Sequence, residues 1–387
     1  MKTVEVTDQL EIEEFIQFPF NLYDDKNSRW VPPIISDMES TLDPSSHPFY
    51  RDPESEAQAF LVKSQGKPRG RIMVIKSGPY LEEHEANPAF FYFFESTHDQ
   101  QGANALFDVA SEWSRDHGLD SLIGPMGMLA GDGHGILIEG FKNRPGMSMP
   151  WNPPYYKDLL ESAGFEKMAD AFSAELLLDF EAHRELIEGL YDSARRVKQR
   201  REIEVKSFDS KRALQKKLPS LIPELCEIYN RSFSELPFYR PTDEDKMRRI
   251  VEQILAVANR RSVKLTQFAV KDDRLIGFLL AYPNIVSELR KARGKLWPIG
   301  WLYLTLGRRF TRWVDANGIG ILPEYQGTGA TVILYANLLR SLERSRFKHL
   351  IINQILEDNH KNLREMKIFD VTEEKFNRVH RIYRRTL

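Results

Sequence analysis

One stretch, residues 318–331, constrains the fold more than any other part of the chain. An apolar run ends at Leu322, a proline follows it, and Gly327 and Gly329 lie in a short polar loop. Apolar residues then recur at helical spacing over 332–344. This pattern predicts the order strand, loop, helix.

A glycine-containing loop between a strand and a helix is a typical anion site. Glycine lets the backbone approach a ligand closely, and the unpaired N–H groups and positive dipole end of the helix attract phosphate. The alternative is an ordinary turn that uses glycine only for its backbone angles. We favour the phosphate site, because the strand and the helix accompany the glycines.

The loop resembles the Q/R-x-x-G-x-G/A motif of the GNAT acyltransferases, in which this loop holds the pyrophosphate of acetyl-CoA. The resemblance implies that the cofactor, acetyl-CoA or another acyl-CoA, is bound here by Gln326, Gly327, Thr328, Gly329, Ala330 and Thr331, and by Ile319, Ile321 and Leu322 on the preceding strand. Thr331 departs from the motif, which ends in Gly or Ala.

The length of 387 residues predicts two domains rather than one ordinary core. The resemblance implies an α/β (α+β) fold with a degenerate GNAT-like domain at 1–172 and a second GNAT domain at 173–387. Each is expected to have a mixed, mostly antiparallel sheet with a parallel splayed strand pair, flanked by helices.

In the first half, apolar runs and a helical pattern give the order β-α-β-β-β-α-β, which a GNAT domain shows. The expected cofactor loop of this half starts at Asp99, and Ala103 stands where the family has Gly. We therefore expect this half not to bind CoA in the usual way.

A glycine-rich segment, residues 124–140, contains Asp132, His134 and Glu139. These side chains would either gather at a catalytic site or belong to a structural loop beneath the second domain. We favour the structural loop, because glycine supplies backbone geometry before anything else. The segment and the Pro-x-Asn-Pro-Pro-Tyr-Tyr block at 150–156 resemble a group of bacterial two-GNAT proteins, the YghO-like group. We expect the functional cleft between the halves, closed by this segment.

In the second half, strands are expected at 312–322 and 348–356, parallel to each other around a crossover helix. In GNAT folds this pair splays and leaves a notch for the pantetheine arm of the cofactor. Gly318 and Gly320 are compatible with a bulge there. The resemblance implies that Asn359, just after the second strand, contacts the cofactor arm.

Transfer of an acyl group from a thioester to an amine requires a neutral nucleophile and an N–H aimed at the developing oxyanion. The backbone of Ile321 or Leu322 is the expected donor. The candidate catalytic side chains are Asp315, Glu357 and Tyr383, although water is an alternative base.

Composition narrows the classes of protein to which the chain can belong. The chain carries 54 basic and 56 acidic residues, so global charge does not favour nucleic acid as a partner. A single cysteine excludes an intrachain disulfide and argues against a Cys-based zinc site; no metal is expected. Without an apolar leader or an 18-residue apolar run, we expect a cytoplasmic protein with no membrane span.

The segment 296–310 is apolar and aromatic and then basic. Three interpretations are open: it rests on a membrane surface, it lines an acyl pocket, or it is a helix packed beside the cofactor strand. We favour the third, because Pro298 and Gly300 interrupt any amphipathic pattern.

The sequence thus favours an N-acyltransferase, such as an N-acetyltransferase, that moves an acyl group from CoA to a small-molecule, peptide or protein amine. One alternative is an aminoacyl transferase of the FemABX-like type, which takes its acyl group from charged tRNA. Another is a non-catalytic acyl-CoA-binding protein, or pseudoenzyme.

Overall fold

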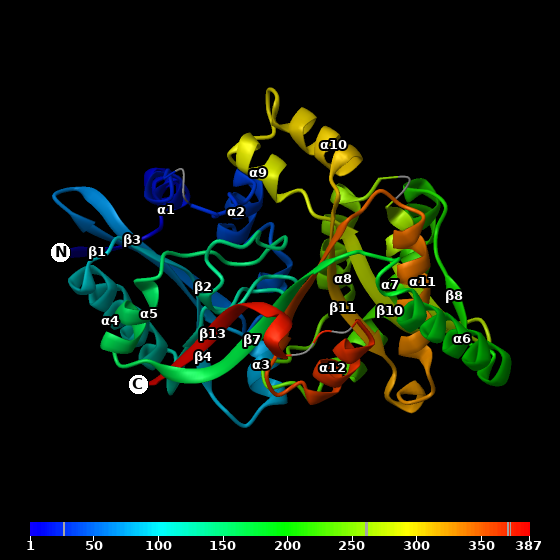
Figure 1. Ribbon diagram of the computed structural model, residues 1–387. Coiled ribbons are helices and arrows are strands. Elements are labelled where there is room, and N and C mark those ends of the chain that lie inside the picture. Colours follow the sequence, from blue (N-terminus) through cyan, green and yellow to red (C-terminus); the bar gives the residue numbers. More distant parts are fainter. Residues whose placement is uncertain (26–27, 260–261, 370, 372) are drawn as a thin grey trace.

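The computed structural model describes residues 1–25, 28–259, 262–369, 371 and 373–387. In this part of the chain, thirteen strands form a single sheet that runs through both halves, with helices on its faces (Figure 1). The strand order is β1-β2-β3-β4-β5-β13-β7-β12-β11-β10-β9-β8, and β6 pairs separately with β13.

The strands are β1 Lys2–Glu5, β2 Glu56–Ser64, β3 Lys67–Lys76, β4 Pro88–Ser96, β5 Ser121–Gly124, β6 Ile136–Glu139, β7 Glu166–Leu177, β8 Glu204–Lys206, β9 Gln267–Lys271, β10 Arg274–Pro283, β11 Trp313–Ile321, β12 His349–Leu356 and β13 Phe376–Thr386.

The α-helices are α1 Gln9–Leu22, α2 Ile35–Leu42, α3 Gly78–Glu83, α4 Gln100–Asp116, α5 Tyr156–Ser162, α6 Arg184–Arg201, α7 Lys211–Phe233, α8 Glu244–Val257, α9 Val286–Ala292, α10 Gly300–Phe310, α11 Ala330–Glu343 and α12 His360–Glu365. Short 3-10 turns lie at Pro48–Arg51, Val263–Leu265, Pro323–Tyr325, Met366–Phe369 and Glu373–Lys375.

Each half contains one parallel strand pair that separates after a few residues. In the first half β4 and β5 pair only over Pro88–Phe90 and Ser121–Ile123, and in the second half β11 and β12 pair only over Trp313–Ala316 and His349–Ile352. The other pairings are antiparallel. The expected fold class, two GNAT-like units with splayed pairs, is confirmed.

The two halves exchange their last strands, which the sequence analysis did not anticipate. The C-terminal strand β13 lies between β5 and β7, whereas β7 lies between β13 and β12 of the second half. The proposed boundary between residues 172 and 173 falls inside β7, so a division of the chain there is not a break in the sheet.

Alternation along the strands divides the core of the second half into two layers. On β10, Phe278 packs with α7 and α8, while its neighbour Leu279 packs with α6 and α11 on the opposite face. In the first half, the predicted apolar face of α4 is buried through Ala103, Leu106, Phe107 and Ala110. The helices therefore cover both faces of the sheet and leave the splayed pairs as the places where a ligand can enter between strands.

Candidate functional site

The predicted strand, loop and helix are present as β11, the Pro323–Tyr325 turn and α11. Gly327 and Gly329 have φ angles of 72° and 94°, in the left-handed region that favours glycine. Gly329 is the N-cap of α11 and supplies no side-chain hydrogen bond to it. Since the first N–H groups of a helix have no intrahelical acceptor, the N-terminus of α11 offers donors to an anion.

The neighbouring side chains stabilise the loop from within. The amide nitrogen of Gln326 donates to the carbonyl oxygen of Ile321 at 3.1 Å, and the hydroxyl of Thr328 donates to the carbonyl oxygen of Tyr325 at 2.6 Å. The hydroxyl of Thr331 is hydrogen-bonded to the carboxyl of Glu365 on α12. Thr331, the departure from the family motif, therefore connects the first turn of α11 to α12.

The corresponding helix of the first half is closed to phosphate. The carboxylate of Asp99 accepts from the backbone N–H groups of Gln101 and Gly102 at 3.1 and 3.4 Å, at the N-terminus of α4. A negative side chain thus already occupies the place of an anion. The N-terminus of α11 in the second half has no such side chain.

The predicted bulge lies at Asn317 and Gly318. On β10, Leu279 pairs with Ile319 and Ala281 pairs with Ala316, so Leu280 faces two residues of β11. The bulge begins where β11 has parted from β12, and Gly318 is exposed there with a φ angle of 112°.

Of the two expected oxyanion donors, only one has its N–H on the open side. The N–H of Leu322 donates to the carbonyl oxygen of Ile276 on β10 at 2.9 Å. Because successive N–H groups of a strand point to opposite edges, the N–H of Ile321 points toward β12, where the strands have separated. Leu322 is therefore not the oxyanion donor, and Ile321 is the remaining candidate.

A cavity of about 630 Å³ lies between the halves, as we expected for the functional cleft. The first half lines it with α2, β4 and the loop after β5, and the second half lines it with α7, α8, β10 and the bulge of β11. Most of its wall is apolar. The apolar lining includes Trp30, Met38, Phe93, Leu129, Met149, Leu225, Phe233, Met247, Ile254, Phe278, Leu280, Leu289 and Leu304.

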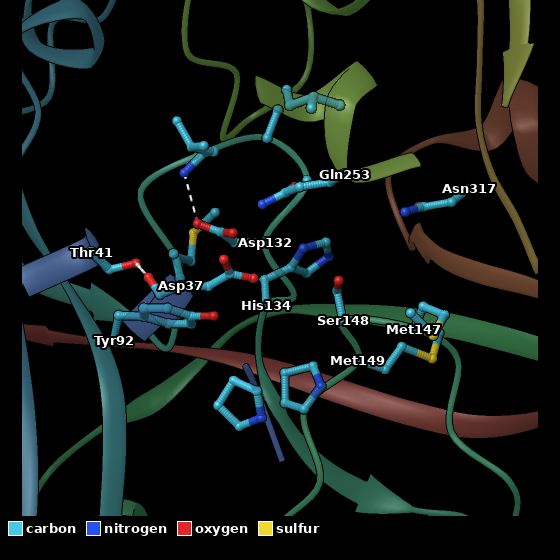
Figure 2. A pocket seen from close by; sticks show the side chains of 18 of the residues that line it. Asp37, Thr41, Tyr92, Asp132, His134, Met147, Ser148, Met149, Gln253 and Asn317 are labelled. Atoms are coloured by element: carbon cyan, nitrogen blue, oxygen red, sulfur yellow. Dashed lines mark hydrogen bonds between the residues drawn. The ribbon is translucent and has the colours of Figure 1, made fainter. Parts of the chain in front are cut away.

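Polar side chains gather on one part of this wall. Figure 2 shows Asp37, Tyr92, Asp132, His134 and Gln253 around the pocket. These residues come from α2, β4, the glycine-rich segment and α8, which are far apart in the sequence. An apolar cavity with a few convergent polar groups is the usual form of a small-molecule site.

The pKa values of the titratable groups on this wall are shifted mainly by burial. Burial, assisted by the charge of Arg240, lowers the pKa of His134 to about 4. Burial raises the pKa of Asp132 and of Asp37, in the latter case against the nearby charge of Arg249. His134 is therefore neutral at pH 7, and within the described residues its Nε2 atom has no hydrogen-bond partner.

Gln354 on β12 holds His134 in this position. Its side-chain amide nitrogen donates to the backbone carbonyl oxygen of His134 at 2.6 Å, and its side-chain amide oxygen accepts from the backbone N–H of His134 at 3.3 Å. Gln354 lies two residues beyond Ile352, the last residue of β12 that pairs with β11. The backbone of His134 is thus joined to β12 near the splay.

The glycine-rich segment packs closely against its neighbours and also contributes to the cavity wall. A Cβ atom on Gly133 would lie 2.1 Å from the carbonyl oxygen of Ser148, so glycine is needed for close packing. Asp132 and His134 from the same segment line the cavity, whereas Glu139 ends β6, where it pairs with Val379 of β13.

The three predicted catalytic residues lie in other surroundings. Asp315 is buried, and its carboxylate accepts from the N–H of Met147 at 2.5 Å and from the side chain of Asn284 at 2.9 Å, so it ties the first half to the second. Burial raises its pKa to about 6. None of the three lines the cavity, and their catalytic role stays a prediction.

Glu357 accepts from the backbone N–H of Asp170 at 3.0 Å and pairs with Lys167 at 2.8 Å. The hydroxyl of Tyr383 donates to Glu161 of the first half at 2.9 Å.

Asn359 is the N-cap of α12, and its side-chain oxygen accepts from the N–H of Asn362 at 3.1 Å. It lies just after β12, as expected, and its contact with a cofactor arm stays a prediction. The sequence analysis missed Asp37, Tyr92 and Gln253. No motif marks them, because each lies on an otherwise ordinary helix or strand.

No family model matches the chain. Two solved structures of similar architecture show its fold. The tandem GNAT protein from the clavulanic acid biosynthesis pathway is 13% identical with a TM-score of 0.54, and the match covers 100% of this chain and 98% of that one. A GCN5-related N-acetyltransferase from Anabaena variabilis is 8% identical with a TM-score of 0.51, over 99% of this chain and 72% of that one. The chain has the fold of a tandem GNAT protein.

Two curated proteins are similar in sequence. A bacterial ceramide synthase of Caulobacter vibrioides is 26% identical over 310 residues, which cover 79% of this chain and 75% of that protein. Protein YghO of Escherichia coli is 24% identical over 358 residues, which cover 90% of this chain and 87% of that protein. These matches fit the YghO-like group of tandem GNAT proteins.

Proposed function

We propose that the protein is an N-acyltransferase that moves an acyl group from acyl-CoA, bound by the second half, to an amine held in the cavity between the halves. The observation that carries this proposal is the difference between the two helix N-termini. That of α11 has no capping side chain, whereas that of α4 is capped by Asp99. Phosphate is attracted to the first and repelled by the second.

Acetyl-CoA or another acyl-CoA would place its pyrophosphate on residues 326–331. Its pantetheine arm would lie between the separated ends of β11 and β12, with Asn359 nearby. The thioester then reaches the bulge at Asn317 and Gly318, which also lines the cavity. Cofactor and acceptor thus approach the bulge from different sides.

In the transfer itself, the nitrogen lone pair of the amine attacks the thioester carbonyl, the C–N bond forms and the C–S bond breaks. The N–H of Ile321 stabilises the oxyanion. The carboxylates of Asp37 and Asp132 attract the amine in its ammonium form, which gives up one proton to water before the neutral amine attacks. His134 keeps its lone pair at pH 7 and accepts the proton of the attacking amine, and its low pKa lets it pass that proton on to water. The departing thiolate takes a proton from solvent.

The apolar wall favours an acceptor or an acyl group with a long aliphatic chain. Burial of each CH₂ group contributes about 0.8 kcal/mol, so a cavity of this kind selects chain length. The Caulobacter vibrioides relative is a bacterial ceramide synthase by name. A ceramide is an amide of a fatty acid with a long-chain amino alcohol, and we propose a long-chain amine as the acceptor class.

The test is calorimetry with acetyl-CoA and with acyl-CoAs of increasing chain length, followed by incubation with a long-chain amino alcohol and mass spectrometry of the products. We expect binding of acyl-CoA and formation of an amide together with free CoA. A wild-type protein that binds no acyl-CoA at millimolar concentration would refute the proposal and favour a non-catalytic protein.

A further inference from the structure

Exposed apolar side chains are concentrated on one protruding segment. Of the eleven large hydrophobic residues that are exposed in the described part of the chain, seven lie between residues 296 and 310. They are Leu296, Trp297, Ile299, Trp301, Leu302, Leu306 and Phe310. In Figure 1, α9 and α10, drawn in yellow, stand out from the top of the molecule.

The expectation that this segment packs beside the cofactor strand is wrong. Helix α10 packs on α9, and a Cβ atom on Gly307 would lie 2.4 Å from the side chain of Glu288, so glycine permits the close approach of the two helices. The opposite side of α10 faces solvent through Leu302, Leu306 and Phe310, which follow each other at intervals of four residues. We call residues 286–312 the α9–α10 segment.

The α9–α10 segment is strongly basic, although the whole chain has a net charge of −2. It contains seven basic residues and a single acidic one, Glu288, whose side chain is only 19% exposed. The basic residues are Arg290, Lys291, Arg293, Lys295, Arg308, Arg309 and Arg312. The exposed apolar residues are thus framed by positive charge.

The inner side of the same segment belongs to the cavity. Ile285, just before α9, Leu289 on α9 and Leu304 on α10 all line it. The segment therefore separates the cavity from the exposed apolar surface by the thickness of one helix layer.

We propose that the α9–α10 segment docks on the surface of an anionic lipid bilayer and places the cavity next to it. Tryptophan and phenylalanine side chains insert at the level of the lipid headgroups, and basic side chains around them are attracted by anionic lipids. Within the described residues, no helix has the length and apolar character needed to cross a bilayer. In this proposal the α9–α10 segment binds to the surface of the bilayer as that of a peripheral protein does.

This inference extends the proposed function, because a long-chain acceptor resides in a bilayer and would enter the cavity beneath α9 and α10. Binding to a bilayer requires no acyl transfer, however. The two proposals therefore fail separately: vesicle binding is measured without acyl-CoA, and acyl-CoA binding is measured without vesicles.

The experiment is co-sedimentation with vesicles of phosphatidylcholine alone and with vesicles that contain equal amounts of phosphatidylglycerol. The apolar variant is Trp297→Ser, Ile299→Ser and Phe310→Ser, whose native side chains are 80%, 57% and 61% exposed. The matched control, Leu10→Ser with Leu177→Ser, removes side chains that are 65% and 64% exposed elsewhere. A charge variant carries Lys295→Glu, Arg309→Glu and Arg312→Glu.

We expect the wild type to bind the anionic vesicles and the apolar variant to bind them at least about tenfold more weakly, with the control unchanged. Each basic residue near the surface contributes about fivefold, so the charge variant should lose binding altogether. The proposal is overturned if the wild type binds neither vesicle, or if the control loses as much as the apolar variant. It is equally overturned if the wild type is a dimer in sedimentation analysis and the apolar variant a monomer, since the surface then joins two copies of the chain.

Discussion

Gln354 and His134 are joined by two hydrogen bonds that cross from the second half of the protein to the first. The side-chain amide of Gln354 is hydrogen-bonded to both the backbone N–H and the backbone carbonyl group of His134, as the backbone of a neighbouring strand would be. The backbone that carries the imidazole of His134 is therefore held by the strand that forms one side of the proposed cofactor notch.

This relationship predicts the behaviour of two variants. Gln354→Ala should lower kcat by about tenfold or more while the dissociation constant for acyl-CoA changes little, because the ring of His134 loses its orientation but residues 326–331 are untouched. His134→Gln should lower kcat further, through loss of the proton acceptor. Steady-state kinetics and calorimetry check both. Unchanged kcat in His134→Gln would exclude His134 as the proton acceptor.

A negative charge placed at the N-terminus of α11 should weaken cofactor binding strongly. Gly329 is unsuitable for this test, since a Cβ atom there would lie 2.6 Å from the side chain of Val197. Thr328→Glu should weaken acyl-CoA binding by about a hundredfold through repulsion of phosphate, whereas Thr328→Gln, of equal size, should stay within a few-fold. Calorimetry with acetyl-CoA measures the difference. Equal affinities of the two variants would contradict the assignment of this loop.

Asp315 should matter for stability rather than for chemistry. In Asp315→Ala the N–H of Met147 and the side chain of Asn284 lose their acceptor, and we expect a loss of about 2–4 kcal/mol in the free energy of unfolding. Asp315→Asn keeps one acceptor and should lose less. Denaturant unfolding and kcat of the Asn variant are the measurements. A stable Asn variant with kcat reduced by orders of magnitude would restore Asp315 as a catalytic candidate.

Acid should destabilise the protein through its buried histidines. Burial lowers the pKa of His380 to about 3 and that of His47 to about 4, whereas an unfolded histidine has a pKa of about 6.5. The unfolded state therefore takes up the proton first, and stability is lost as the pH falls from about 6.5 toward these folded-state values.

His380 donates through Nε2 to the carbonyl oxygen of Pro150 at 3.0 Å, a contact that a glutamine amide can reproduce. Between pH 7.5 and pH 4.5, the free energy of unfolding of His380→Gln should therefore fall less than that of the wild type. The difference between the two decreases should reach up to about 3 kcal/mol. Urea unfolding at the two pH values gives the comparison. A variant with the same pH dependence as the wild type would contradict this source of acid sensitivity.

The strand, loop and helix at residues 313–343 were predictable because their signals are local. The change from an apolar run to helical spacing, with Gly327 and Gly329 between them, already fixes strand, loop and helix. The bulge at Gly318 was predictable for the same reason. Ala103 marked the departure of the first loop from the motif, but the capping of α4 by the carboxylate of Asp99 was not predicted.

The cavity residues and the strand order depend instead on contacts between segments that are distant in the sequence. Asp37 and Tyr92 reach the cavity only because α2 and β4 meet the second half, and no spacing in the sequence records that. Tyr383 lies on β13, and the alternating pattern of that strand is the same whichever strands flank it. The exchange of β7 and β13 is therefore invisible to a reading of periodicity.

The position of β13 also has a consequence for the order of folding during synthesis. Tyr383 pairs with Gly124, so β5 gains its inner neighbour only after β13 of the second half has left the ribosome. Until then the edge of β5 is unpaired and open to other strands. Folding of the first half must wait for the second, because a strand translated with the second half closes the sheet of the first.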